Sequence, residues 1–238
     1  MDVKLIAHRG YAVHAPQNSL EAFERAGQLG FWAIETDVHR TADGVLVCNH
    51  DATVDRMFNG SGEIRAMRFP ELSALRFRAE RKNGSTRDEG MPLFAQYLDI
   101  CRRYGAVPFI ETKTLDVEEV LFEALRFFPK ERIVISSTEL EHLRLARRCC
   151  AGVFVHHIFS GPEAMEELAG MGPAGVSLNY PELDAFDPRW VDTAHGLGLK
   201  LCLRAGDDAQ RLARMCALGL DYIPTNCMTP EMARAVVG

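Results

Sequence analysis

Eight short, largely apolar segments separated by stretches with helical spacing constrain the fold of this 238-residue chain more than any other feature. They lie at 3–7, 33–40, 107–113, 132–137, 152–157, 175–179, 200–204 and 221–226. Near-continuous apolar strands that alternate with helices indicate a parallel sheet covered on both faces. Eight strand–helix units in roughly 250 residues are the usual size of a (β/α)8 barrel, also called a TIM barrel, so we predict that architecture.

The intervening stretches predict the helices. The first begins after a cap at Asn18 or Ser19 and ends near Gly30. The others are expected at about 93–104, 116–128, 139–149, 162–170, 187–197 and 207–218, and residues 229–237 close the chain. A doubly wound open sheet is the alternative, but no GxGxxG turn follows the first strand. Residues 51–90 have no clean period, and we expect a small insertion there, with a short helix near 70–75, in a single domain spanning the chain.

The segment 33–51 predicts a β-hairpin, because an Asp-Gly pair at 43–44 flanked by β-branched and apolar residues is a strong turn signal. A two-residue loop at this pair would place Asp37 opposite His50 in the ladder. Glu35 and Asp37 are two residues apart, so they project from the same face of their strand. Two carboxylates and one imidazole are therefore expected to meet at one place.

These carboxylates predict a metal site. Burying two neighbouring carboxylates is costly unless a cation or a shared proton offsets their repulsion. The apolar run 31–34 indicates that the strand enters a core, which argues against the alternative of a solvated strand face. Glu111 ends a later strand, and the C-terminal ends of barrel strands share one rim. Three carboxylates, Glu35, Asp37 and Glu111, suit a hard divalent cation such as Ca²⁺ or Mg²⁺, with Mn²⁺ also possible.

Other polar residues gather at the same predicted rim. His8 and His50 suit general acid–base catalysis near neutral pH. Arg9 and Lys113 add fixed positive charge, and the whole set suits an anionic substrate such as a phosphate ester. Each residue alone has an ordinary alternative, and it is their convergence that favours a site. The remaining polar strand ends are Ser136, Ser137, His156, His157, Asn179, Arg204, Thr225 and Asn226.

The other histidines carry a weaker signal. Alternation along a strand directs only one member of the 156–157 pair inward, where it could line the pocket. The remaining four show no convergence and are expected to be structural or exposed. They are His14, His39, His142 and His195.

Composition and charge indicate which kinds of partner the protein binds and in which compartment it works. The net charge of −6 gives no broad attraction to nucleic acid or to anionic membranes. No apolar run reaches the roughly 18 residues of a membrane span, and the apolar start at 3–7 is too short for a signal peptide. Seven cysteines without a CxxC pair suit neither a disulfide framework nor a zinc site. We expect a cytoplasmic protein with a small-molecule substrate and no stable membrane anchor.

A series of short motifs spans nearly the whole chain. It comprises His8-Arg9-Gly10, Ala15-Pro16-Gln17-Asn18-Ser19, Ile34-Glu35-Thr36-Asp37-Val38, Thr41-Ala42-Asp43-Gly44, His50-Asp51, Asp55-Arg56 with Asn59-Gly60-Ser61-Gly62, Glu111-Thr112-Lys113 and Gly219-Leu220-Asp221-Tyr222-Ile223. This series resembles the glycerophosphodiester phosphodiesterase family. The resemblance implies a (β/α)8 barrel that hydrolyses glycerophosphodiesters to glycerol 3-phosphate and an alcohol, uses Ca²⁺ or Mg²⁺, and carries a small cap region, here the segment 51–90.

The resemblance also implies roles for individual residues. The acid–base pair is His8 and His50, and the metal ligands are Glu35, Asp37 and Glu111. The residues that it implies contact the phosphate are Arg9 and Lys113. We expect Asn18 and Arg204 to contact the substrate as well. The order of the two histidines, the alcohol, the native metal and a cyclic phosphate intermediate stay open at this point.

Two positions depart from the family pattern. Gln17 stands where a glutamate is common, which removes a negative charge and keeps the hydrogen-bonding reach. Arg204 stands where a tryptophan is common, so a cation replaces an apolar wall and favours a more acidic alcohol. The alternatives are a phospholipase D-type lipid hydrolase on a similar barrel and a ligand-binding pseudoenzyme. The polar segment 51–90 argues against the first, and the complete set of core residues argues against the second.

Overall fold

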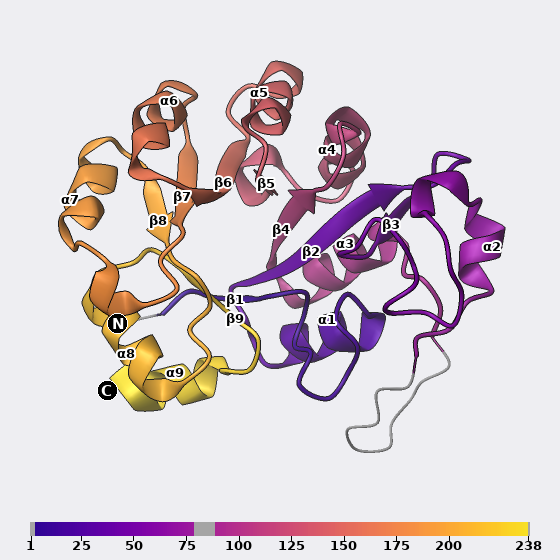
Figure 1. The fold of residues 1–238 in the computed structure, drawn as a ribbon, viewed down its shortest axis with the longest axis horizontal. Helices are drawn as coiled ribbons and strands as arrows, with labels where there is room; N and C mark the ends of the chain where they lie inside the picture. Colours follow the sequence, from indigo (N-terminus) through magenta and orange to yellow (C-terminus); the bar gives the residue numbers. More distant parts are fainter. Residues whose placement is uncertain (1–2, 79–88, 238) are drawn as a thin grey trace.

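The computed structural model describes residues 3–78 and 89–237, and in it eight parallel strands form a nearly closed barrel surrounded by helices (Figure 1). The strands are β1 (Leu5–Ala7), β2 (Ala33–Arg40), β4 (Val107–Thr112), β5 (Val134–Ser137), β6 (Phe154–Ser160), β7 (Ala174–Leu178), β8 (Lys200–Cys202) and β9 (Ile223–Thr225). Their order is β8-β7-β6-β5-β4-β2-β1-β9, and β3 (Leu46–Cys48) pairs antiparallel to β2. The predicted (β/α)8 barrel is confirmed, and the open doubly wound sheet is excluded.

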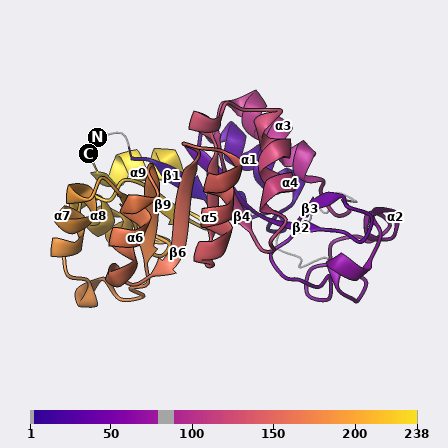
Figure 2. The same cartoon turned by 90° about the horizontal axis from the view of Figure 1, so that it is seen from above.

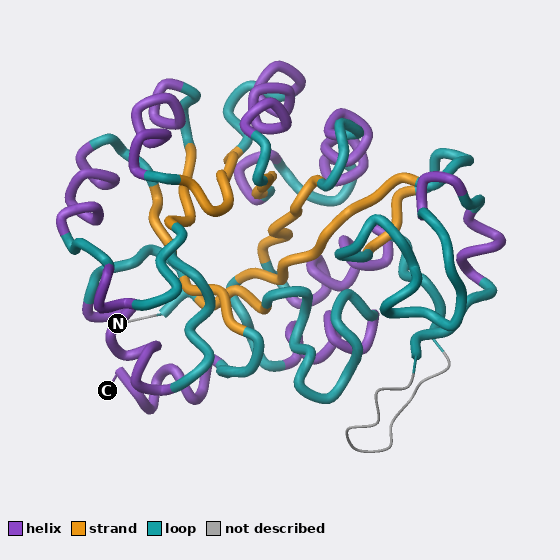
Figure 3. Tube along the Cα trace, viewed as in Figure 1, coloured by secondary structure: helices purple, strands orange, loops and turns teal. Residues whose placement is uncertain are grey.

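Helices connect successive strands and cover the outside of the barrel (Figures 2 and 3). They are α1 (Leu20–Gln28), α2 (Phe69–Ser73), α3 (Phe94–Tyr104), α4 (Val117–Leu125), α5 (Leu140–Cys149), α6 (Met165–Gly170), α7 (Arg189–Gly196), α8 (Ala209–Ala217) and α9 (Pro230–Val237). Short 3₁₀ turns lie at Ile64–Ala66, Lys130–Arg132, Pro162–Ala164 and Leu183–Ala185. Ser19 caps α1 as predicted, because its hydroxyl accepts a hydrogen bond from the Ala22 N–H at 3.1 Å.

The core has two layers around the barrel wall. The outer layer packs the helices on the strands; Phe23 of α1, for example, meets Tyr97 of α3 edge-on with ring centroids 5.0 Å apart. The inner layer fills the barrel with a smaller cluster that includes Phe109 and Tyr222. Since both faces of each strand are covered, the strands read as the near-continuous apolar runs seen in the sequence.

Between β8 and β9 the barrel is closed by individual hydrogen bonds and not by a regular ladder of paired strands. The order of paired strands ends at β8 on one side and at β9 on the other. We call the two facing segments there, 200–207 and 221–227, the seam. The Asp221 N–H donates to the Leu201 carbonyl at 3.0 Å, and the Gly206 N–H donates to the Pro224 carbonyl at 2.9 Å. The seam therefore joins the last strand, and through it β1, to the rest of the barrel.

The hairpin forms as predicted, but its predicted register is wrong by one residue. Val38 pairs with Cys48, and the Asn49 N–H donates to the Asp37 carbonyl at 3.0 Å, so Asn49 and not His50 lies opposite Asp37. The reason is a three-residue loop in place of a two-residue loop. The Gly44 N–H closes a turn onto the Thr41 carbonyl at 3.0 Å, and Gly44 has φ +85°, the left-handed conformation that a three-residue hairpin loop requires.

The expected insertion after the hairpin has an apolar cluster of its own. Val54, Phe58, Ile64 and Leu72 are fully buried and pack with Val47 of β3. The short helix expected near 70–75 is α2. The part of the insertion at 79–88 lies outside the described residues. None of the described helices combines the length and the apolar character that a membrane span needs.

Candidate active site

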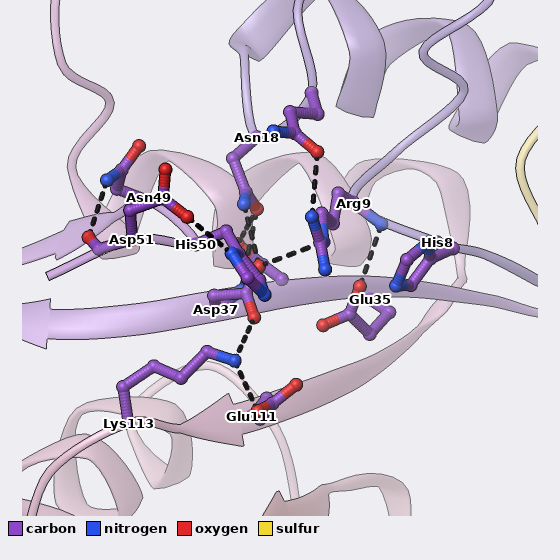
Figure 4. Close-up of polar contacts among 12 residues, drawn as sticks. His8, Arg9, Asn18, Glu35, Asp37, Asn49, His50, Asp51, Glu111 and Lys113 are labelled. Carbon is purple, nitrogen blue, oxygen red and sulfur yellow. Dashed lines mark hydrogen bonds and ion pairs between the residues drawn. The ribbon is translucent and has the colours of Figure 1, made fainter. Parts of the chain in front are cut away.

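Three carboxylates meet where β2 and β4 lie side by side (Figure 4). Glu35 and Asp37 come from β2, and the parallel ladder places Asp37 directly beside Glu111 of β4. One oxygen from each of the three carboxylates lies within 4.8 Å of the others. Asp37 is fully buried and Glu35 is 6% exposed, so water screens their mutual repulsion poorly.

The protonation behaviour of these carboxylates follows from their burial. Burial raises the pKa of Glu35 well above its usual range, and the charges of Asp37 and Glu111 raise it further. Burial and then Asp37 also raise the pKa of Glu111. Burial acts on Asp37 in the same direction, but Lys113 and Arg9 outweigh it and hold the pKa of Asp37 below its usual value.

One oxygen of this cluster has neither a hydrogen bond nor an ion pair with the described residues. Among the described residues, the buried Oε1 of Glu35 accepts no hydrogen bond. An unpartnered buried anionic oxygen is costly, and a hard cation coordinated by carboxylates removes that cost. The donor set therefore fits a divalent cation held by Glu35, Asp37 and Glu111.

Two basic residues border the carboxylates. The Lys113 ammonium lies 2.9 Å from Asp37 Oδ1 and also contacts Glu111 Oε1. The backbone N–H of Arg9 donates to Glu35 Oε2 at 2.7 Å, and its guanidinium Nε lies 3.4 Å from Asp37 Oδ2. The Nη1 atom of the same guanidinium donates to Gln17 Oε1 at 2.9 Å, so the uncharged Gln17 orients Arg9. Arg9 has φ +59°, a conformation that is strained for a residue with a side chain.

Asn18 lies behind Asp37 and is 1% exposed. Its amide nitrogen donates to Asp37 Oδ2 at 2.8 Å, and its amide oxygen accepts a hydrogen bond from the Thr36 hydroxyl at 2.8 Å. These contacts orient the Asp37 carboxylate. The contact of Asn18 with substrate expected from the sequence stays a prediction.

His8 lies beside Glu35, just after the end of β1 (Figure 4). Its ring Nδ1 is 2.8 Å from Oδ1 of Asn226, and the Asn226 amide nitrogen donates to Asp207 Oδ2 at 2.6 Å. Burial, and then the charge of Arg9, lower the pKa of His8. The imidazole is therefore neutral at neutral pH.

His50 lies on the Asp37 side of the cluster (Figure 4). Its Nδ1 is 2.7 Å from Asp51 Oδ1, and Arg56 donates to the other Asp51 oxygen at 2.6 Å. The hydrogen bond from Arg56 is the main cause that lowers the pKa of Asp51 to about 2. The His39 ring, expected to be structural or exposed, is buried, and its Nε2 lies 3.3 Å from the His50 carbonyl. His39 thus supports the backbone at His50.

Among the remaining sequence candidates, Ser136 of β5 pairs with Glu111 in the sheet. Arg204 is exposed two residues beyond the end of β8, and its contact with substrate stays a prediction. His156 is the inward member of its pair, and it is buried inside the barrel between Ser177 and Tyr222, at 2.7 Å from each hydroxyl. Burial, and then His157, lower the pKa of His156 to about 3, so it is a neutral core residue.

The sequence analysis did not single out Asp207, Asp51 or Arg56 as supports of the two histidines. Asp51 was visible in the His50-Asp51 motif, and Arg56 could have been considered as its partner. Asp207 lies in a loop after β8, and its contact with the end of β9 depends on the seam. The one sequence signal near Asp207 was that Asn226 is a polar residue at the end of a predicted strand.

Comparison with known proteins identifies what this chain is similar to. A family model described as the glycerophosphoryl diester phosphodiesterase family matches residues 8–229. A glycerophosphodiester phosphodiesterase of Caldanaerobacter subterraneus subsp. tengcongensis is 29% identical over 95% of this chain and 95% of its own length.

Solved structures share the fold. The glycerophosphodiester phosphodiesterase of Parabacteroides distasonis is 27% identical, with a TM-score of 0.79 over 99% of this chain and 97% of that one. An Oleispira antarctica phosphodiesterase, solved in complex with the product sn-glycerol-3-phosphate, is 23% identical, with a TM-score of 0.84 over 98% and 96% of the two chains.

Proposed function

This chain belongs to the glycerophosphoryl diester phosphodiesterase family and is a phosphoric diester hydrolase, and from this premise we propose that a divalent cation and two histidines carry its hydrolysis of glycerophosphodiesters. The products would be glycerol 3-phosphate and an alcohol. The Oleispira antarctica phosphodiesterase, whose structure holds sn-glycerol-3-phosphate, supports this product class. We propose the whole chain as one catalytic domain, with residues 51–90 as its insertion.

The observation that carries the proposal is the cluster of three carboxylates with an unpartnered buried oxygen on Glu35. Glu35, Asp37 and Glu111 would hold Ca²⁺ or Mg²⁺, with Mn²⁺ as a further candidate. A bound cation of this kind supplies charge stabilisation for phosphoryl oxygens. Lys113 and Arg9 border the same carboxylates and add positive charge for an anionic phosphodiester.

The two histidines would move the protons. In both rings Nδ1 is engaged by a neighbouring side chain, which leaves Nε2 as the atom that exchanges a proton with the reacting oxygens. One histidine would take the proton of the attacking hydroxyl, and the other would donate a proton to the leaving alkoxide. The attacking hydroxyl is either water or the glycerol hydroxyl next to the phosphate, and the latter gives a cyclic phosphate.

Hydrolysis of a panel of glycerophosphodiesters tests the proposal. Release of glycerol 3-phosphate is measured with EDTA and with added Ca²⁺, Mg²⁺ or Mn²⁺. Activity that is lost with EDTA and restored by one of the ions supports the carboxylate site. Full turnover in EDTA by protein shown to be free of metal contradicts it. The preferred alcohol in the panel, compared between wild type and Arg204→Trp, tests whether Arg204 sets the preference.

A further inference from the structure

The carboxylate of Asp207 clamps the end of β9 at the rim of the barrel that carries the site. Its Oδ1 accepts hydrogen bonds from the Asn226 backbone N–H at 2.7 Å and from the Thr225 hydroxyl at 3.0 Å. Its Oδ2 accepts a hydrogen bond from the side-chain amide nitrogen of Asn226 at 2.6 Å. Three hydrogen bonds accepted by one carboxylate thus fix both the backbone and the side chain of Asn226.

These contacts determine which way the Asn226 amide faces. An ionised carboxylate only accepts hydrogen bonds, so the NH₂ group of Asn226 must face Asp207. The amide oxygen then faces His8 Nδ1, at 2.8 Å. Since this oxygen also only accepts, the hydrogen between the two side chains belongs to His8 Nδ1. The neutral ring consequently carries its lone pair on Nε2.

We propose that Asp207 and Asn226 are positioning residues that hold His8 in its Nδ1–H tautomer, so that Nε2 accepts the proton of the attacking hydroxyl. The inference rests on the function proposed above for His8. In this step the O–H bond of the nucleophile breaks and an Nε2–H bond forms on His8. The resulting imidazolium keeps its Nδ1–H bond to Asn226, and the electron pair of the broken O–H bond stays on the oxygen that attacks phosphorus.

The contacts define an isosteric test. In Asp207→Asn, the new amide oxygen keeps the contacts with Thr225 and the Asn226 backbone, and its NH₂ group replaces the acceptor Oδ2. The Asn226 amide must then turn its oxygen towards position 207 and its NH₂ group towards His8. A donor facing Nδ1 favours the Nε2–H tautomer. The change reverses the polarity of the hydrogen bonds and leaves their number unchanged.

The double variant Asp207→Asn/Asn226→Asp restores the original polarity at His8, since position 226 again accepts the hydrogen bond from Nδ1. The carboxylate at position 226 accepts from both the amide at position 207 and His8 Nδ1–H. Asp221→Asn is the matched control, because Asp221 clamps the same seam at the opposite end of the barrel. It accepts hydrogen bonds from the Leu201 N–H and the His195 ring at 2.9 Å each.

Two measurements read out the tautomer and its consequence. The ¹⁵N chemical shifts of the His8 ring, assigned by comparison with His8→Gln, report the tautomer above the ring's pKa without any substrate. The kcat and KM for glycerophosphocholine with added Mg²⁺ or Ca²⁺ report the reaction. In the wild type we expect the His8 ring to carry its hydrogen on Nδ1. In Asp207→Asn we expect a shift towards the Nε2–H tautomer and a fall in kcat of about tenfold or more, with little change in KM. In the double variant we expect both the tautomer and kcat to recover.

A His8 ring that keeps its wild-type ¹⁵N pattern in Asp207→Asn, or a double variant that recovers neither readout, would overturn the proposal. Asp221→Asn should leave both readouts unchanged. If Asp207→Asn does not fold, Asn226→Ala takes its place, and an unchanged His8 tautomer there overturns the proposal equally. If wild type hydrolyses no diester, the proposed function fails, and the ¹⁵N shifts still decide whether Asp207 and Asn226 set the tautomer.

Discussion

The two histidines beside the carboxylates are supported in opposite ways. His50 is held by Asp51, the next residue along the chain, and Asp51 is held by Arg56, five residues further on. His8 is held by Asn226, which is 218 residues away along the chain. The His50 side of the site is thus built from local contacts. The His8 side depends on closure of the whole barrel.

The two sides also differ in charge. His50 faces the carboxylate of Asp51. His8 faces the neutral amide of Asn226, and burial lowers its pKa. Two rings beside the same three carboxylates therefore have an acidic partner on one side and an amide partner on the other. The comparison teaches that two histidines beside the same carboxylates differ in their partner at Nδ1, which is the atom that fixes the tautomer of each ring.

Removal of either ring is expected to have the largest effect and tests whether both sides are needed. His8→Ala and His50→Ala should each lower kcat by about 10²–10⁴-fold, the usual contribution of general acid–base catalysis. Binding of Mg²⁺ or Ca²⁺, measured by calorimetry, should persist because the carboxylates remain. His195→Ala, at the opposite end of the barrel, is the control. Full activity in either variant would remove that histidine from the mechanism.

A glycine substitution tests the dependence of the His8 side on packing. Gly10 has φ +78°, and a Cβ added there would lie 2.8 Å from the backbone carbon of Ala22. Gly30 has φ +76°, and no described atom lies within 4 Å of such a Cβ. Backbone strain costs about 1–2 kcal/mol in both variants. Overpacking adds about 1–3 kcal/mol in Gly10→Ala alone.

Urea denaturation measures both free energies of unfolding. Gly10→Ala should be the less stable variant, and it should also lose activity, because Gly10 follows the turn that carries His8 and Arg9. Equal losses of stability in the two variants would show that the contact with Ala22 relaxes without cost.

Replacing the Asp51 carboxylate beside His50 should lower catalysis less than removing either histidine ring does. Asp51→Asn replaces a charged acceptor by a neutral one, and we expect kcat to fall by about tenfold, a part of the effect of removing the ring. Asp55→Asn is the matched control, since Asp55 lies in the same insertion and accepts a hydrogen bond from the Gly62 N–H at 3.2 Å. Steady-state kinetics of both variants decide the matter, and equal kcat values would show that the charge of Asp51 is dispensable.

The ion pair of Asp51 with Arg56 should have the smallest effect, and its pH dependence has a definite sign. The pKa of Asp51 is lowered to about 2, so its carboxylate stabilises the folded protein above its ordinary pKa of about 3.9. This stabilisation is lost as the pH falls from about 4 to about 2. The stability difference between wild type and Arg56→Gln should therefore shrink over that range.

Denaturation at several pH values and two salt concentrations checks this expectation. High salt should reduce the difference further, because both side chains are partly exposed. A difference that grows as the pH falls would mean that Arg56 stabilises the fold through another contact.

The fold could be predicted from the sequence because its signals are local. Apolar runs such as 132–137 and caps such as Ser19 need no knowledge of distant residues. The register of the hairpin could not be predicted, since an Asp-Gly pair suits loops of two and three residues alike. The hydrogen bond between Thr41 and Gly44 decides between them, and it depends on the folded turn.

The residues of the site also differ in whether local sequence signals could predict their contacts. The meeting of Glu35, Asp37 and Glu111 followed from side-chain alternation and the common rim of parallel strands. The partners of His8 did not follow, because the position of Asp207 depends on how two loops meet across the seam. Alternation predicted that one of the two histidines at 156–157 points inward, and the structure shows that it is His156. Its burial between Ser177 and Tyr222 depends on strands that no local pattern connects.

The pairing of β1 with β9 has a consequence for protein synthesis. A nascent chain emerges from its N-terminus, so the carboxylates, His50 and Arg56 are all made long before Asn226. Until β9 emerges, β1 lacks one of its two neighbours and His8 lacks the residue that we propose sets its tautomer. An unfinished chain can therefore assemble the carboxylates before it can position His8. Only a chain translated through its last strand can hold both histidines in the surroundings that the proposed proton transfer requires.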